Sequence, residues 1–118
     1  MKEKRKQRIA SFLRNEIALI IQRELKDPRI GLISVTRVEP TEDLRYASVH
    51  VSVMGSEAEQ RTSLRGLEAA RSHIQNLLGD RVHFRHTPEI RFVLDDSIRK
   101  QMEMEALIKR AREEDEDK

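Results

Sequence analysis

The chain has 118 residues and no cysteine, and its aromatic side chains are three Phe and one Tyr. The absence of cysteine excludes a disulfide framework and thiolate metal sites. The scarcity of aromatic rings argues against an RNA-binding sheet that stacks bases. Apolar and charged residues each make up 37% of the sequence, which predicts one domain with a modest core beneath a strongly charged surface.

The formal net charge is only +2, but the two ends of the chain differ in sign. The first fourteen residues hold one acidic side chain, Glu3, against Lys2, Lys4, Arg5, Lys6, Arg8 and Arg14. Residues 113–118 read EEDEDK. We expect a single domain over residues 1–110, an acidic disordered tail over residues 111–118, and a polyanionic partner for the basic body.

No apolar run is long enough to cross a membrane, and no apolar signal core follows the charged N-terminal segment. We therefore expect a soluble, cytoplasmic monomer that does not associate with membranes.

The first predicted element is a helix over residues 3–25. Apolar residues recur at three- and four-residue steps, from Ile9 to Leu25, while polar residues fall on the opposite side. Glu16 and Glu24 stand at the edges of the apolar face, where each either reaches solvent or meets a partner. Asp27-Pro28 ends this helix, because the residue before proline is disfavoured in helical geometry.

Two strands follow, over residues 33–39 and 45–54. The first is rich in β-branched residues, and its alternation slips between Val35 and Val38, which indicates a bulge or a strong twist. The second alternates apolar and polar residues strictly from Ala47 to Val53. One face of that strand is therefore expected to be buried and the other to be exposed to solvent, which predicts a sheet covered by helices on one side.

A second helical region begins at Ser56, whose spacing to Glu59 is that of a capping box. It continues to Leu78, and Gly79 then stands where a left-handed residue would end the helix. Gly66 lies inside this helix, which suggests a packing reason or a bend. A third strand over residues 90–94 and a last helix over residues 98–110 complete an α+β fold with a three-stranded sheet.

Candidate chemistry is sparse in this sequence. His83 and His86, with His50, could supply imidazoles to a metal, but an extended link points His83 and His86 to opposite faces, so we expect surface histidines. The Asp95-Asp96 pair is best explained as a helix cap. Neither a phosphate-cradling glycine loop nor a serine or cysteine nucleophile motif is present. We therefore predict a protein without catalytic activity, metal or cofactor.

Arginine is the residue that points to a ligand, because its planar fork binds phosphate in a bidentate manner. Many arginines with few aromatic rings favour recognition of the shape and backbone of a folded RNA. Some of these arginines lie within helical reach of glutamates and could be ordinary surface ion pairs. We predict that the RNA contacts come from Lys4, Arg5, Arg8, Arg45, Arg61, Arg65, Arg71, Arg81 and Arg85.

Four blocks of the sequence, in this order and spacing, resemble the ribosome-binding factor A family of bacterial small-subunit assembly factors. They read EIALIIQRELKDPRIG (residues 16–31), VTRVEPTEDLRYASVHVSV (residues 35–53), LEAARSHIQNLLG (residues 67–79) and RHTPEIRFVLDDS (residues 85–97). The resemblance covers nearly everything from Arg8 to Ile108.

This resemblance implies a KH-like fold of the order helix, strand, strand, helix, kink, helix, strand. It implies binding to the small ribosomal subunit and its ribosomal RNA late in maturation, support for processing of the RNA 5′ end and for growth in the cold, and no catalysis or cofactor. The family replaces the Gly-x-x-Gly loop of other KH domains with a helix kink at Ala-x-Gly. Here that block is Ala70-Arg71-Ser72, with serine where glycine is usual.

A second hypothesis is a protein-interaction module. In that case the solvent-exposed face of the second strand and the acidic tail would bind a partner protein.

Overall fold

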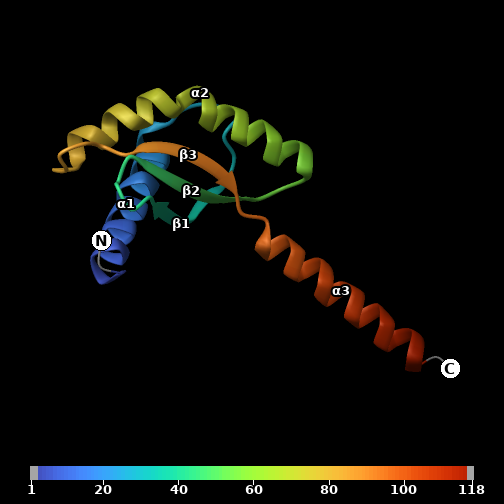
Figure 1. Cartoon of the computed structure of the whole chain (residues 1–118). Coiled ribbons are helices and arrows are strands. Elements are labelled where there is room, and N and C mark those ends of the chain that lie inside the picture. The colour runs from blue at the N-terminus through green and yellow to red at the C-terminus, as the bar shows by residue number, and fades with distance from the viewer. Residues whose placement is uncertain (1–2, 117–118) are drawn as a thin grey trace.

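The computed structural model describes residues 3–116 and contains three helices and three strands in the predicted order (Figure 1). They are α1 (Glu3–Glu24), β1 (Ile33–Pro40), β2 (Tyr46–Val53), α2 (Glu57–Arg81), β3 (Glu89–Leu94) and α3 (Ser97–Glu116). This is an α+β fold of KH-like order, as predicted, with an additional C-terminal helix.

The sheet has the strand order β1-β2-β3, so that β2 is the central strand. β1 and β2 are antiparallel and joined by a short turn, whereas β2 and β3 are parallel. Parallel neighbours need a crossover connection, and α2 supplies it. α1 packs on β1, and α2 packs on both α1 and β3, so the two helices cover one face of the sheet.

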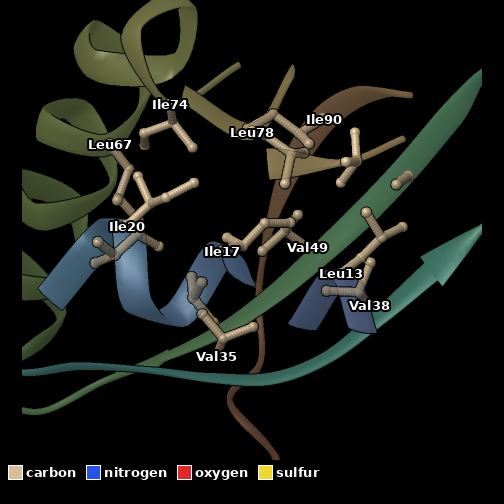
Figure 2. Packing of buried hydrophobic residues seen from close by; sticks show 14 of the residues in the cluster. Leu13, Ile17, Ile20, Val35, Val38, Val49, Leu67, Ile74, Leu78 and Ile90 are labelled. Atoms are coloured by element: carbon tan, nitrogen blue, oxygen red, sulfur yellow. The ribbon is translucent and has the colours of Figure 1, made fainter. Parts of the chain in front are cut away.

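The strict alternation along β2 decides which side chains enter the core. Val49 and Val51 are fully buried against the helices, whereas Tyr46 lies on the exposed face. Figure 2 shows the side chains of α1, α2 and the strands converging on one another in this layer. The core consists of Leu13, Ile17, Ile20, Ile21, Val35, Val38, Ala47, Val49, Val51, Val53, Leu67, Ile74, Leu78, Val82 and Ile90.

The predicted slip in the first strand is a β-bulge. Val35 pairs with Val51 and Arg37 pairs with His50, so Thr36 is the extra residue. The Thr36 hydroxyl lies 3.2 Å from the His50 carbonyl oxygen and 2.8 Å from a carboxylate oxygen of Asp95. The bulge thereby links the edge strand to the end of β3.

Gly66 has a packing reason. A Cβ added there would lie 2.7 Å from Cγ1 of Ile30 and 3.3 Å from Cβ of Arg29, both in the loop that follows α1. The buried Ser63 fixes the same loop, because its hydroxyl accepts the Gly31 N–H at 3.2 Å and donates to the Arg29 carbonyl at 3.3 Å. The loop therefore reaches the start of β1 in close contact with α2.

One expectation for α2 differs from the structure. Gly79 does not end the helix, which continues to Arg81. The chain becomes extended at Val82, whose side chain is buried in the core. α2 is also one continuous helix across Ala70-Arg71-Ser72. Ser72 does not bond back to the carbonyl four residues earlier in the described chain, although Thr62 does so at 3.0 Å. Figure 1 shows α2 arching over the sheet without a break.

The C-terminal segment also differs from the prediction of a disordered tail over residues 111–118. α3 runs to Glu116, and residues 117–118 lie outside the described residues. Side-chain contacts of i,i+4 spacing support its first turns, with Arg99–Glu103 at 3.2 Å and Lys100–Asp96 at 3.4 Å. No described residue of α3 is buried, and the helix projects away from the sheet (Figure 1).

Substitution of the two helical glycines should have opposite effects on stability. Gly66→Ala should lower the free energy of unfolding by about 1–3 kcal/mol, because its Cβ would overlap Ile30. Gly79→Ala is the matched control: its Cβ meets only Thr87 at an ordinary 3.5 Å, so it should raise stability by about 0.5–1 kcal/mol. Urea unfolding measures both. A Gly66→Ala protein as stable as the native chain would contradict the packing account.

Candidate nucleic-acid interface

The N-terminal turns of α1 carry three of the predicted contact residues. Lys4, Arg5 and Arg8 are all exposed. α1 is held at this end by Lys6, whose Nζ lies 3.3 Å from a carboxylate oxygen of Glu42 in the turn between β1 and β2. The basic start of α1 therefore lies beside that turn, although the two are far apart in the sequence.

The turn itself supplies Arg45, which is exposed and lies 3.8 Å from Asp43. Its carbonyl oxygen accepts the Glu89 N–H at 2.8 Å, which joins the turn to the beginning of β3. The Asp43 carboxylate fixes the turn by accepting the Thr41 hydroxyl at 2.7 Å, and this bond lowers the pKa of Asp43. The guanidinium of Arg45 is thus presented from a rigid turn.

The loop between α2 and β3 brings Arg85 to the same end of the molecule. Phe84 in this loop packs edge-on against Phe12 of α1, with ring centroids 6.2 Å apart. Arg85 next to it is exposed. Figure 1 shows the α1 start, the β1–β2 turn and this loop gathered on the left of the molecule. We call this surface the basic end, and it consists of Lys4, Arg5, Arg8, Arg45 and Arg85.

Arg81 is engaged in holding the fold together. Its guanidinium nitrogens lie 3.5 Å from Glu16 and 3.7 Å from Glu24, both on α1. Arg81 and Glu16 are half-buried, so this ion pair joins the end of α2 to α1. The two glutamates at the edges of the apolar face of α1 indicated a possible ion pair in the sequence. Their partner could not be identified before the fold was known.

The remaining predicted contacts lie on α2, and of these Arg71 is near the basic end, because its partner Glu89 donates its N–H to the Arg45 carbonyl oxygen. Arg71 contacts Glu68 at 3.7 Å and Glu89 at 3.9 Å, and it is half-buried. Arg61 and Arg65 are exposed and have no ion-pair partner within residues 3–116. Twenty helical residues separate Arg61 from Arg81, which corresponds to about 30 Å. Arg61 and Arg65 therefore form a second, separate basic patch.

The segment Ala70-Arg71-Ser72 does not offer the free backbone N–H groups by which a glycine loop would hold phosphate, because α2 is continuous there. Gln75, one turn further on, ties the helix to β3: its amide nitrogen lies 2.6 Å from the Pro88 carbonyl oxygen, and its amide oxygen accepts the Ile90 N–H at 2.9 Å. This part of α2 therefore has a structural function.

The histidines are dispersed. His83 and His86 are exposed in the loop before β3, and His50 lies in the sheet with one nitrogen 3.9 Å from Glu39. Within residues 3–116 no three His, Asp or Glu side chains are placed to hold a metal ion. No helix in this part of the chain is long and apolar enough to cross a membrane.

Asp95 and Asp96 have structural partners. One oxygen of Asp95 accepts the Ser97 N–H at 3.1 Å and the Ser97 hydroxyl at 2.6 Å, and the other accepts the Thr36 hydroxyl at 2.8 Å. These bonds, led by that from the Ser97 hydroxyl, lower the pKa of Asp95 to about 2. Asp96 pairs with Lys100. The carboxylates start α3 and join it to the β1 bulge.

The fold and this surface define a KH-like domain with a basic end and no glycine loop. The sequence model of the family "Ribosome-binding factor A" matches residues 5–108. A protein of that name from Halothermothrix orenii is 48% identical over 116 residues, covering 98% of this chain and 95% of the relative. The relative from Acetivibrio thermocellus is 56% identical over 93 residues, covering 78% and 76%.

Two structures are also similar to this chain. The crystal structure of ribosome-binding factor A from Thermus thermophilus is 30% identical, with a TM-score of 0.68, and the match covers 75% of this chain and 93% of that one. The second is a homology model of the Thermus thermophilus protein that was fitted into a cryo-EM map of a 30S–RbfA complex; it is 30% identical, with a TM-score of 0.62 and coverage of 74% and 91%. The chain belongs to the ribosome-binding factor A family.

Replacing Asp95 should change how stability depends on pH. The lowered pKa means that the ionised carboxylate stabilises the fold above about pH 4, and that this contribution is lost as the pH falls toward about 2. Asp95→Asn should therefore unfold more easily than the native chain at pH 7, and the difference should shrink at pH 2.5. Urea unfolding at both pH values measures it, and a difference independent of pH would contradict the assignment.

Proposed function

We propose that this chain binds the small ribosomal subunit by placing its basic end against phosphates of the ribosomal RNA. The observation that carries the proposal is the convergence of three separate segments, each of which brings exposed cations to one end of the fold. The contacts that bring them together are Lys6–Glu42, Phe12–Phe84 and the backbone bond between Arg45 and Glu89. Cations held at fixed positions bind phosphate with less loss of entropy than cations on mobile segments.

The chemistry of the basic end favours recognition of the RNA backbone. Four of its five residues are arginines, whose guanidinium groups match phosphate oxygens in a bidentate manner. The one exposed aromatic ring of the sheet, Tyr46, lies under the guanidinium of Arg91 at 4.4 Å, which covers one face of the ring. Binding is therefore expected to depend on the shape of the RNA more than on its sequence.

In this proposal the protein acts without catalysis and without a cofactor, by occupying or reshaping a site on the subunit late in its maturation. It would thereby support processing of the RNA 5′ end and growth in the cold, in the cytoplasm, and it would bind the subunit as a monomer. Membership of the ribosome-binding factor A family supports this function, as does the Thermus thermophilus relative placed in a 30S complex.

Sedimentation of the protein with purified ribosomal particles tests the assembly role. The native chain should co-sediment with free small subunits and should be depleted from complete ribosomes and polysomes. In a cell lysate, treatment with nuclease should release the protein from the particles, because the proposed partner is RNA. Association only with complete ribosomes would contradict the assembly role, and association that survives nuclease would favour a protein partner instead.

Charge reversal tests which surface makes the contact. Arg8→Glu combined with Arg85→Glu should weaken binding to small subunits by about tenfold or more, because two charge-assisted contacts become repulsive. Arg61→Glu combined with Arg65→Glu changes the net charge equally at the far end of α2 and is the matched control, with a smaller loss expected. Binding measured by filtration or sedimentation decides between the two surfaces. A larger loss in the Arg61/Arg65 variant would place the interface on α2.

A further inference from the structure

Helix α3 is held to the domain by its first turn, where Arg99 contacts Glu57 and Gln60 of α2, and the rest of the helix makes no ion pair or side-chain hydrogen bond with another helix or strand of the described chain. α3 contains 20 residues, none of which is buried. In proteins most of the stability of a helix comes from the packing of its apolar face against another element. Five large apolar side chains of α3 are between 46% and 65% exposed: Ile98, Met102, Met104, Leu107 and Ile108. Another surface that covered them would both stabilise the helix and remove this apolar area from water.

Part of this apolar surface forms a continuous stripe. Met104, Leu107, Ile108 and Ala111 follow one another at steps of three, one and three residues, so they share one face of the helix. Four charged residues border the stripe, and their signs alternate along the chain. Glu103 and Arg110 follow one edge, whereas Lys100 and Glu114 lie seven residues before and after Leu107, in line with it, at the two ends of the stripe. A stripe bordered by charges of alternating sign is typical of a helix that pairs with another helix.

The order of these charges is complementary to its own reverse: a positive residue in one direction corresponds to a negative residue in the other. In an antiparallel pair of helices related by a two-fold axis, each edge of one helix meets the same edge of the other. Aligned at Leu107, Glu103 of each copy then lies opposite Arg110 of the other, and Lys100 lies opposite Glu114. Both of these facing pairs are therefore of opposite charge, and the apolar stripes face each other at the centre.

The groups required for this pairing are available. Arg110 and Glu114 have no ion-pair partner within residues 3–116. Glu103 and Lys100 make the surface ion pairs with Arg99 and Asp96, and exposed pairs of this kind are weak enough to exchange partners. α3 also projects freely from the domain, so a second helix can lie along it (Figure 1).

We propose that α3 pairs with α3 of a second copy of this chain in an antiparallel arrangement centred on Leu107. The apolar stripe of one copy is thus covered by the same stripe of the other copy. Because the helices run in opposite directions, the two domains lie at opposite ends of the pair. The pairing is reversible and depends on protein concentration, so it belongs to the free protein and leaves the basic end open for RNA.

Sedimentation velocity of the full chain over a range of concentrations tests the pairing. The native protein should shift from monomer to dimer as concentration rises. Glu103→Lys alone and Arg110→Glu alone should each weaken the dimer by about tenfold or more, because each variant brings like charges together in both symmetry-related pairs. Mixing the two variants should restore dimerisation, since every facing pair in the mixed dimer is again of opposite charge.

The mixture makes the test specific for the antiparallel register. A native chain that stays monomeric at all concentrations, or two variants that do not associate when mixed, would overturn the proposal. Leu107→Asp should abolish the dimer while leaving the thermal unfolding of the domain unchanged, because Leu107 is not part of the core. If Leu107→Asp instead weakened binding to small subunits while the native protein was monomeric, the stripe would belong to the subunit interface and the proposal would be wrong.

Discussion

The alternation of side chains along β2 is the constraint on which the rest of this structure depends. Because Ala47, Val49, Val51 and Val53 all point to one side, both α1 and α2 must pack on that side of the sheet. The parallel pairing of β2 with β3 then requires α2 to cross the full length of the sheet between them. The ends of the helices and the loops that join them are left at the two ends of the sheet, and the basic end is assembled there.

The basic end depends on contacts between segments that are distant in the sequence. Lys6 and Phe12 hold α1 to the β1–β2 turn and to the loop before β3, while Arg81 joins α2 to the outer edge of α1. These contacts use charged and aromatic side chains outside the valine and isoleucine core. In this chain α2 is continuous through Ala70-Arg71-Ser72, and the exposed cations of the basic end lie on the segments that these contacts join.

The sequence predicted features that arise from local periodicity and failed where tertiary contacts decide. The order of the elements, the irregularity between Val35 and Val38 and the single covered face followed from apolar spacing and are confirmed, and the structure shows that the irregularity is a bulge at Thr36. Gly79 was expected to end α2, but burial of Val82 sets the end of the helix. The predicted contact residues could not be sorted from the sequence: Arg81 is tied to α1, whereas Arg8 and Arg85 remain exposed.

The dependence of subunit binding on salt tests most directly whether the basic end contacts phosphates. Each cation that neutralises a phosphate contributes about −0.7 to −0.9 to the slope of log affinity against log salt concentration. The native chain should therefore give a slope of about −2 or steeper with purified small subunits, and replacing Arg8 and Arg85 by alanine should make it shallower by about 1.5. An affinity that does not vary with salt, or a slope unchanged by both substitutions, would contradict the account.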